Sequence, residues 1–385
     1  MKVLVIGCGL QGRAVVHDLA ASDAVEQVTC ADVDLQMAQT VCEHAGGNKL
    51  RAVALEAGDA AALSRLIDGG FDVVVDMLPR QFIRRVAKAC IAAGVHLVNT
   101  YYDHELLDLD GAAREAGVAM LPEMGLDPGI DLVMAAEAVR RFDRVTHLLS
   151  YGGGFPEAGA DDNPLRYRIS WTWEGVLNAY ARSSRQVHQG NIVDVAAEHI
   201  FDEDKVHSVD VSPFGSLEAY LNGDAAEYAQ RFGIADSAQE VGRYALRWPG
   251  HVSLWRALVG LGFLEQEPVP GLGGVTPREF MIKHLEPRLQ YGPGQRDAVI
   301  LRVDARGEGG ASDRLVLELI DYGDPVTGLM AMNRTVGFPA SIAAQMLASG
   351  QISARGLLSP IQHMPWTTLV EELSRRGITI VERTA

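Results

Sequence analysis

The sequence begins with a short apolar run and a glycine-rich turn, and this pattern constrains the fold more than any other feature of the chain. Residues Val3 to Ile6 predict a buried strand, the next six residues form the turn Gly7-Cys8-Gly9-Leu10-Gln11-Gly12, and an amphipathic stretch follows from Arg13 to Ala20. A buried strand, a G-x-G-x-x-G turn and a helix are the parts of a dinucleotide-binding unit. The alternative is an α/β fold whose glycine turn binds nothing.

The residues of this turn each have a physical reason to be there. Gly7 allows the tight turn, Gly9 lets the backbone approach a pyrophosphate, and Gly12 lets the helix pack closely on the strand. The start of the helix also offers unpaired N–H groups and the positive end of a dipole to the phosphates. We therefore expect these glycines, together with Leu10 and Gln11, to bind the cofactor.

A second apolar strand, from Val25 to Cys30, leads to Asp32, twenty residues past Gly12. An acidic side chain at this place accepts hydrogen bonds from a ribose 2′-hydroxyl and repels a 2′-phosphate. Asp32 therefore predicts NAD rather than NADP as the cofactor. Asp34 is a second candidate for the same contact.

Apolar runs and helical patterns alternate up to about residue 125. Strands are expected at residues 50–55, 72–76, 96–99 and 118–120, and helices at residues 35–45, 60–67 and 81–93. Such alternation predicts an α/β fold with a parallel, doubly wound sheet. Ligands bind at the carboxyl ends of such strands, so residues that follow two of the strands should border the cofactor. These residues are Met77, Leu78 and Pro79, and Thr100, Tyr101 and Tyr102.

The pattern changes between about Val145 and Leu329. Runs at residues 146–150, 167–173, 186–195 and 298–304 are β-like and aromatic, and helices are expected at 241–247 and 253–261. This composition predicts an antiparallel sheet with a few helices. Helical patterns also occur before this region, at 132–141, and after it, at 339–348 and 367–376.

Length, charge and cysteine content exclude several classes of protein. A chain of 385 residues suits two domains. The net charge of −16 argues against nucleic acids and anionic membranes as partners, and no apolar stretch approaches the ~20 residues of a membrane helix. The four cysteines lack metal-ligand spacing and no H-E-x-x-H occurs, so we expect no metal site. The chain begins without a charged leader, which favours a cytoplasmic protein.

Seven segments together resemble the saccharopine dehydrogenase family, most closely its single-chain lysine 6-dehydrogenase-like members. They are MLPRQF (77–82), NTYYD (99–103), GLDPGID (125–131), SYGGGFP (150–156), YRISWTWEGVLNAY (167–180), RYALRWPGH (243–251) and MNRTVGFPASIAAQML (332–347). The resemblance implies a Rossmann dinucleotide-binding domain formed by residues 1–126 and 332–385. It also implies a second, α+β domain at residues 127–331, with a mixed or antiparallel sheet, that binds the substrate and forms a homodimer.

The resemblance places two catalytic candidates near the nicotinamide. Asp127 matches the family's aspartate that faces the substrate, although Asp127 followed by Pro128 also predicts a helix N-cap worth about 1 kcal/mol. Tyr102 matches a family tyrosine, and a tyrosine packed at the sheet edge is its structural alternative. Tyr101 replaces a family serine, which puts that serine's hydrogen bond in doubt here.

Arg243 and Arg247 lie in a segment that resembles the family's substrate-carboxylate site. Guanidinium groups bind carboxylates in a planar, bidentate manner, and at a spacing of four they would share one face of the expected helix. A solvated helix face is the alternative for this pair. His251 ends the same segment, and we consider it as either a catalytic or a structural histidine.

One departure from the family bears on the substrate. Members that form saccharopine carry an arginine in an Asn-Arg-Asp segment, which corresponds here to residues 222–224, with Gly223 at the centre. Gly223 cannot bind the second, glutamate-derived carboxylate. A single amino acid therefore fits the site better than a two-headed opine, unless Arg182 or Arg231 substitutes.

The resemblance implies NAD-dependent oxidation of the terminal amine of lysine, which gives 2-aminoadipate 6-semialdehyde and ammonia. The amine, with a pKa of about 10.4, must lose its proton before hydride transfer. Asp127 would orient the amine, Tyr102 or His251 would relay the proton, and Arg243 or Arg247 would anchor the carboxylate. The alternatives are a saccharopine-forming reductase and a non-enzymatic NAD-binding regulator. A sugar or inositol oxidoreductase is disfavoured because the Glu-Lys-Pro stretch those proteins share is absent.

Overall fold

The computed structural model describes residues 1–384, which form two units. Unit 1 consists of Met1–Met134 and Asn333–Thr379, and unit 2 consists of Ala135–Met332 and the residues from Ile380 onward. We expected the first boundary at residue 127 and expected the whole tail from residue 332 in the Rossmann domain. Residue 385 of that predicted range lies outside the described residues.

Unit 1 contains a parallel sheet with the strand order β15-β6-β5-β4-β1-β2-β3. Its strands are β1 (Lys2–Ile6), β2 (Gln27–Asp32), β3 (Leu50–Ala54), β4 (Val73–Asp76), β5 (His96–Asn99), β6 (Ala119–Leu121) and β15 (Gly356–Leu357). The order β3-β2-β1-β4-β5-β6 is that of a doubly wound dinucleotide-binding fold. The predicted α/β fold class and parallel sheet are confirmed.

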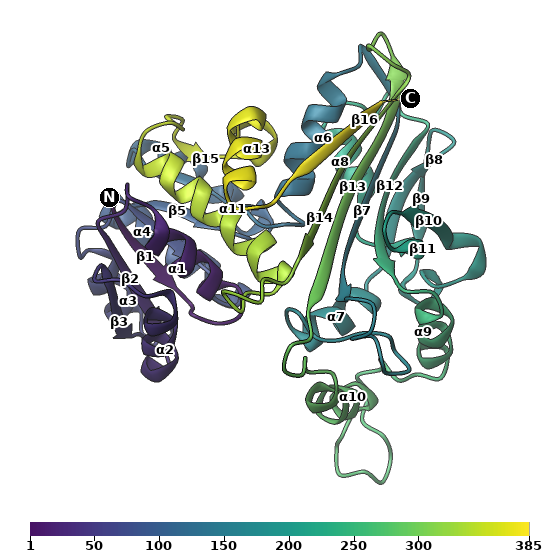
Figure 1. The fold of residues 1–385 in the computed structure, drawn as a ribbon, viewed down its shortest axis with the longest axis horizontal. Coiled ribbons are helices and arrows are strands. Elements are labelled where there is room, and N and C mark those ends of the chain that lie inside the picture. Colours follow the sequence, from purple (N-terminus) through teal and green to yellow (C-terminus); the bar gives the residue numbers. More distant parts are fainter. Residues whose placement is uncertain (385) are drawn as a thin grey trace. The chain divides into compact units, whose positions relative to one another are not determined.

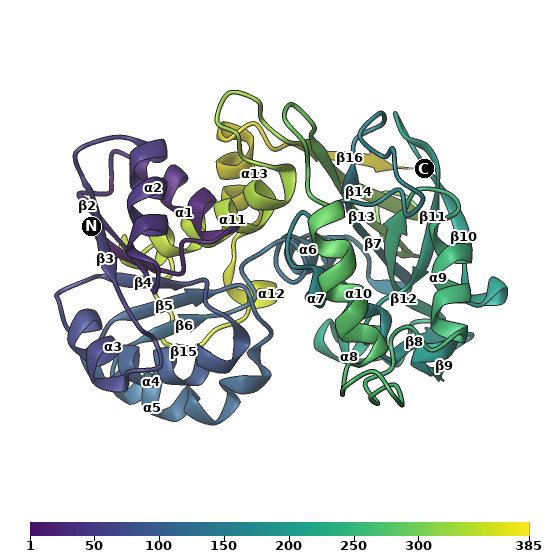
Figure 2. The same cartoon turned by 90° about the horizontal axis from the view of Figure 1, so that it is seen from below.

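Helices cover both faces of this sheet, with α1, α2 and α11 on one face and α3, α4 and α5 on the other (Figure 2). Their bounds are α1 (Gly12–Ala21), α2 (Leu35–Ala45), α3 (Ala60–Ile67), α4 (Ile83–Ala93), α5 (Asp110–Glu115), α11 (Ala331–Ala348), α12 (Pro360–His363) and α13 (Trp366–Arg375); α6 (Ile130–Arg140) leads from unit 1 into unit 2. Because both faces are covered, strands such as β4 are buried along their whole length rather than at every second residue.

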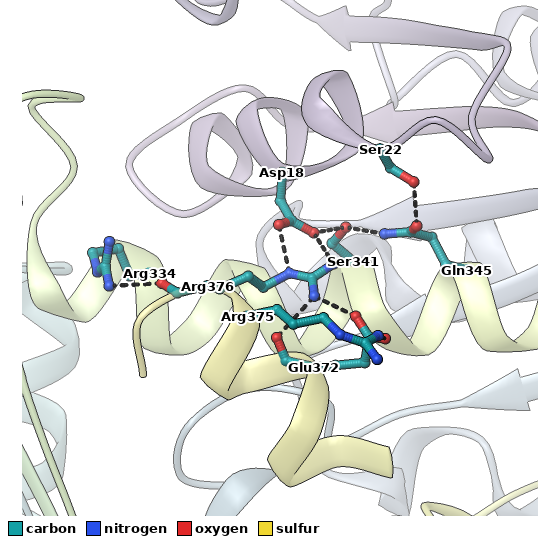
Figure 3. A network of polar contacts seen from close by, with 8 residues as sticks. All are labelled: Asp18, Ser22, Arg334, Ser341, Gln345, Glu372, Arg375 and Arg376. Carbon is teal, nitrogen blue, oxygen red and sulfur yellow. Dashed lines mark hydrogen bonds and ion pairs between the residues drawn. The ribbon is translucent and has the colours of Figure 1, made fainter. Parts of the chain in front are cut away.

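The returning C-terminal helices are tied to α1 by a buried polar network (Figure 3). Arg376, just after α13, donates from Nε to Asp18 Oδ1 at 2.6 Å and from Nη2 to Asp18 Oδ2 at 3.0 Å. Ser341 of α11 donates to the same carboxylate at 2.6 Å, and Glu372 accepts from Arg376 Nη1 at 2.5 Å. The network holds α11 and α13 against the helix that follows the glycine turn.

Unit 2 contains a nine-stranded mixed sheet. Its main path is β10-β11-β12-β7-β13-β14-β16, and β8 pairs with β12 and β9 at one side. The strands are β7 (Arg144–Pro156), β8 (Ser184–His188), β9 (Asn191–Val195), β10 (His207–Val211), β11 (Gly215–Leu221), β12 (Glu240–Arg247), β13 (Asp297–Glu308), β14 (Arg314–Tyr322) and β16 (Ile380–Thr384). The long central strands run side by side in Figure 1. Only β7 and β12 pair in parallel within the path of the described sheet, so the sheet is mixed, which is one of the two forms that the resemblance implied, rather than wholly antiparallel as the residue pattern predicted.

An apolar core packs on each face of this sheet. The helices of unit 2 are α7 (Trp173–Tyr180), α8 (Ala225–Arg231), α9 (His251–Gly260) and α10 (Pro277–Leu285). One core joins α7, α9 and α10 to β11 and β12 and is rich in buried aromatic rings, including Trp173 and Trp255. The second core, around Phe155 and Trp248, lies on the opposite face.

Three local predictions are wrong. Residues 241–247 form a strand, because β12 is hydrogen-bonded between β7 and β11 and this pairing overrides a weak helical pattern. Residues 167–172 form no strand, because their aromatic side chains enter the core instead. Pro339 lies inside α11, which begins eight residues earlier, at Ala331.

Candidate nucleotide and substrate sites

The glycine turn of unit 1 has the geometry that a bound dinucleotide requires. Gly7 has a φ of +96°, and a Cβ at Gly7 would lie 2.9 Å from the carbonyl carbon of Met77. A Cβ at Gly12 would lie 1.9 Å from the oxygen of Gly7. By contrast, a Cβ at the exposed Gly9 would meet nothing within 4 Å. Gly7 and Gly12 are therefore required by packing, whereas Gly9 leaves open space beside the backbone for a pyrophosphate.

The predicted cofactor residues after β4 lie next to this turn. The Met77 amide donates to the oxygen of Ile6 at 2.8 Å, which brings the ends of β1 and β4 together at the point where the strand order reverses. Leu78 and Pro79 continue from this point. A ligand of a doubly wound sheet binds at this place.

The predicted residues after β5 lie one strand further along. Thr100 packs against Gly125, where a Cβ would lie 3.3 Å from Thr100 Cβ. Tyr101 packs against the core beneath α4, and burial raises the pKa of its hydroxyl. Tyr102 is half-buried and stacks on His104, with ring centroids 5.9 Å apart.

The two aspartates at the end of β2 have different roles. Asp32 Oδ2 accepts from the Cys8 amide at 2.7 Å and its Oδ1 accepts from the Asp34 amide at 3.0 Å, so its carboxylate is fixed beside the glycine turn. Asp34 instead caps α2 by accepting from the amides of Gln36 and Met37. The proposed ribose contact therefore suits Asp32 better than Asp34.

The sequence reading missed three residues near this site. Val33, directly after Asp32, is 69% exposed although it is apolar. Gly337 of α11 permits a close approach to α1, because a Cβ there would lie 2.7 Å from Ala14 Cβ. Asn333 accepts from Arg13 Nη2 at 2.7 Å. An apolar residue directly after the acidic end of the strand was the one signal available in the sequence.

A buried carboxyl group lies at the end of β4. Asp76 is 0% exposed, and its Oδ1 accepts from the Leu78 amide at 3.0 Å. Among residues 1–384, Oδ2 has no hydrogen-bond partner. Burial raises the pKa of Asp76 to about 7, and the Leu78 amide opposes this shift.

Asp127 does not directly precede a helix, as the N-cap alternative required. It lies exposed in a turn whose Asp127–Pro128 peptide is cis, and α6 begins only at Ile130. Two backbone hydrogen bonds close this turn. The Gly125 amide donates to the carbonyl oxygen of Pro128 at 3.0 Å, and the Ile130 amide donates to the carbonyl oxygen of Gly125 at 2.9 Å. Asp127 therefore lies in a non-helical turn before α6.

Arg243 and Arg247 both lie on β12, not on a helix. The conclusion that they share a face still holds, since a spacing of four is also a multiple of the two-residue period of a strand. This face carries Ala245 and packs on the aromatic core of α7 and α9. About 13 Å of strand separates the two arginines.

Arg243 lies beside Gly223. It is buried, and its guanidinium carbon stands 4.3 Å from the ring centroid of Tyr228. A Cβ at Gly223 would lie 3.2 Å from Arg243 Nη1 and 3.6 Å from Arg182 Nη2. Arg182 also donates from Nη2 to Asn222 Oδ1 at 2.9 Å. Two guanidinium groups therefore lie close to Gly223. Positive charge is present here although Gly223 replaces the arginine of the saccharopine-forming relatives.

Arg247 and His251 belong to the buried aromatic core. The guanidinium carbon of Arg247 stands 5.2 Å from the ring centroid of Tyr167. His251 Nδ1 lies 3.0 Å from the oxygen of Leu165 and Nε2 lies 2.8 Å from the hydroxyl of Tyr180. Burial and then the Arg247 charge lower the pKa of His251 to about 3, so the ring is neutral. With both nitrogens engaged, His251 suits positioning of Tyr180 better than a proton relay.

Two further features concern metals and membranes. Within residues 1–384, no three His, Cys, Asp or Glu side chains gather in a way that could hold a metal ion. In the same part of the chain, no helix has the length and apolar character needed to cross a membrane.

The parallel sheet, with its glycine turn at the point where the strand order reverses, defines unit 1 as a pyridine-nucleotide-binding domain. The chain matches the saccharopine dehydrogenase NADP binding domain over residues 3–121 and the saccharopine dehydrogenase C-terminal domain over residues 125–378. The protein therefore belongs to the saccharopine dehydrogenase family, as the sequence motifs predicted.

The sequence matches to several relatives extend over nearly the whole of this chain. The mitochondrial alpha-aminoadipic semialdehyde synthase of Bos taurus is 28% identical over 98% of this chain and 47% of its own length, so the chain spans about half of that relative. The saccharopine dehydrogenase [NADP(+), L-glutamate-forming] of Saccharomyces cerevisiae is 28% identical over 100% of this chain and 99% of its own. A solved apo saccharopine dehydrogenase (L-Glu forming) from the same yeast has a TM-score of 0.86 and 27% identity, and the match covers 100% of this chain and 99% of that one.

Proposed function

We propose that this protein is a pyridine-nucleotide-dependent oxidoreductase that acts on the CH–NH bond of saccharopine and releases L-glutamate. Loss of a hydride from the lysine-derived carbon that is bonded to the secondary amine gives an imine between that carbon and the nitrogen. Water then hydrolyses the imine to L-glutamate and 2-aminoadipate 6-semialdehyde. The full-length likeness to glutamate-forming saccharopine dehydrogenases favours this reaction over the lysine oxidation that we expected from the sequence.

The observation that carries the proposal is the pair of guanidinium groups around Gly223. Saccharopine bears carboxylates on both its lysine-derived and its glutamate-derived halves, whereas lysine bears one. Arg182 and Arg243 supply positive charge where the sequence suggested a gap, and Arg247 lies further along the same strand face. Separate cationic sites on one face suit a two-headed substrate.

The chain's own residues have defined tasks in this reaction. The backbone amides around Gly9 would hold the pyrophosphate, and the nicotinamide, when bound, accepts the hydride. Arg243 would hold a substrate carboxylate and so align the reacting carbon. Asp127 or Tyr102 would take the proton that the secondary amine must lose before hydride transfer.

The choice of nucleotide is a separate proposal. Asp32 places a carboxylate at the end of β2, where it would accept from a ribose 2′-hydroxyl and repel a 2′-phosphate. We therefore propose that NAD is preferred, although the yeast relatives are named for NADP(+). The two nucleotides can be compared directly through kcat/KM.

Purified protein assayed at the nicotinamide absorbance tests the reaction. Saccharopine with either oxidised nucleotide should give turnover at least a hundredfold above L-lysine, and the reverse reaction should require both the semialdehyde and L-glutamate. Turnover of lysine without turnover of saccharopine would overturn the proposal.

The second candidate is lysine 6-dehydrogenase-type deamination, which the absent side chain at Gly223 favours. The same assay decides between the two, because only this reaction releases ammonia. A homodimer stays a prediction from the family resemblance, and light scattering of the purified chain checks it.

A further inference from the structure

Two polar side chains that the sequence did not single out lie side by side at the ends of β4 and β5. Asp76 is the last residue of β4, Asn99 is the last residue of β5, and the two are paired in the register of these strands. Side chains alternate along a strand, so Asp76 lies on the same face as Val74, and Asn99 on the same face as Leu97. Val74 and Leu97 both belong to the core beneath α3 and α4. Asp76 and Asn99 therefore point to one face of the sheet, on strands about 4.8 Å apart.

Each of these side chains holds the segment that follows its own strand. Asp76 Oδ1 accepts from the Leu78 amide at 3.0 Å, and Asn99 Oδ1 accepts from the Tyr101 amide at 3.0 Å. Aspartate and asparagine stabilise turns in this manner, by bonding to the backbone two residues further on. The first segment, residues 77–79, borders the glycine turn, and the second, residues 100–102, carries Tyr102. Both segments that we expect beside the nucleotide are thus held by a side chain at a strand end.

The second polar atom of each side chain is buried and has no partner within residues 1–384. This atom is an acceptor in Asp76, Oδ2, and a donor in Asn99, Nδ2. Asp76 is 0% exposed and Asn99 is 1% exposed, so bulk water does not satisfy either atom. On its other side Asp76 pairs with the apolar Ile6 of β1, which leaves Asn99 as its polar neighbour in the sheet. An acceptor and a donor at paired positions suit each other, since a small side-chain rotation or one shared water satisfies both.

The charge of Asp76 also reaches the segment that Asn99 holds. Burial raises the pKa of the Tyr101 hydroxyl, and the Asp76 carboxylate adds to the increase. Burial likewise raises the pKa of the Cys90 thiol of α4, again with a contribution from Asp76. Asp76 is therefore close to both segments and not only to its own.

We propose that Asp76 and Asn99 act as one positioning pair, which holds residues 77–79 and 100–102 in the arrangement that binds the pyridine nucleotide. Both act through the backbone that they hold, so they are positioning residues rather than catalytic ones. The proposal concerns nucleotide binding by unit 1 and goes beyond the proposed reaction. Only an effect on turnover through Tyr102 rests on the proposed function.

Titration of the purified full chain with NADH and with NADPH, followed by nucleotide fluorescence at about pH 8, tests the pair. Asp76→Ala and Asn99→Ala should each raise Kd about three- to tenfold, because each loses one hydrogen bond that orders a segment. Asp76→Asn should stay within about twofold of wild type, because asparagine keeps an acceptor for the Leu78 amide. Asp59→Ala is the matched control, because Asp59 Oδ1 accepts from the Ala61 amide at 2.9 Å in the same manner, at the start of α3, where no residue is predicted to bind nucleotide. This control should leave Kd unchanged.

An exchange of the two side chains tests whether they act together. Asn99→Asp keeps an acceptor for the Tyr101 amide but places a second buried carboxyl group beside Asp76, and like charges in such a place are unfavourable. This variant should raise Kd at least about tenfold at about pH 8. Adding Asp76→Asn restores one carboxyl and one amide group, and should return Kd to within about threefold of wild type. Side chains that act independently would give no such rescue.

Two results would overturn the pair: a Kd within about twofold of wild type in both alanine variants, or an Asn99→Asp defect that Asp76→Asn does not relieve. Urea unfolding of the same variants recognises a merely structural role, which would lower the unfolding midpoint and leave Kd unchanged. If an alanine variant does not fold, the exchange of side chains decides alone. The pair and the proposed reaction can fail separately, because nucleotide binding is measured without substrate. A rescued Kd without saccharopine turnover retains the pair and removes the reaction, whereas saccharopine turnover with an unrelieved Asn99→Asp defect retains the reaction and removes the pair.

Discussion

Replacement of Asp76 by asparagine should stabilise the protein, and the gain should depend on pH. The carboxyl group is fully buried at the end of β4, and one of its oxygens has no partner in residues 1–384. Asparagine keeps the shape and can still accept from the Leu78 amide through Oδ1. It removes only the charge that burial disfavours.

The magnitude follows from the pKa of the group. An aspartate has a pKa of about 3.9 in an unfolded chain, and burial raises that of Asp76 to about 7. Between these values the folded state binds more protons than the unfolded state, so the free energy of unfolding falls as pH rises through this window. At about 1.4 kcal/mol per pH unit, the penalty reaches about 4 kcal/mol above pH 7 and is about half of that at about pH 5.5.

Urea unfolding of wild type and Asp76→Asn at about pH 8 and about pH 5.5, followed by circular dichroism, measures this gain. Asp59→Asn is a suitable control, because the Ala62 and Ala61 amides lower the pKa of Asp59 and its window therefore lies below both pH values. The control should change stability equally at both. An equal gain for Asp76→Asn at the two pH values would refute the reasoning, and so would a loss at about pH 8.

Three further substitutions test the nucleotide and substrate sites, and one tests the returning helices. Asp32→Ala should lower kcat/KM for NAD relative to NADP; unchanged selectivity would remove Asp32 from nucleotide choice. Asp127→Asn should lower kcat at least tenfold in a protein whose circular dichroism is unaltered, and near-normal turnover would exclude it from the mechanism. Arg182→Met should raise KM for saccharopine several-fold with little change in kcat, whereas an unaffected KM means that Arg182 does not contact substrate. Arg376→Met should lower the free energy of unfolding by about 3–5 kcal/mol in urea, because it leaves the buried Asp18 carboxylate without its ion-pair partner and with only the Ser341 hydroxyl of this network as a donor; a change under about 1 kcal/mol would contradict the role of this network.

The local pattern of unit 1 was readable from the sequence because its signals are short-range. Residues 35–45 and 60–67 are helices with the predicted bounds. Asp34 and Asp59 each cap the helix that follows by accepting from two amides, which is a signal within four residues of sequence. The glycine turn likewise depends on neighbours within one strand, one turn and one helix.

The features that were misread depend on contacts distant in sequence. Asp297 of β13 accepts from the Ala331 and Met332 amides at 2.6 and 2.9 Å, so a carboxylate more than thirty residues away starts α11 well before Pro339. Strand β12 exists because two other strands flank it. The sequence pattern that suggested a helix at residues 241–247 contains no information about these neighbouring strands.

The substrate site shows the same limit. Gly223 suggested a missing cation, and Arg182 was one of two substitutes that the sequence offered, but the sequence does not reveal that Arg243 of β12 also approaches Gly223. Arg247 could be singled out by its motif, but not its burial against the ring of Tyr167. Substrate choice in this fold therefore depends on tertiary placement of common residue types.

The stoichiometry of products tests the central claim most directly. Purified protein is incubated with saccharopine and oxidised nucleotide, and L-glutamate is measured against reduced nucleotide in the same sample. The account predicts one L-glutamate for each reduced nucleotide. Reduced nucleotide without L-glutamate, or no reduction with either nucleotide, would contradict it.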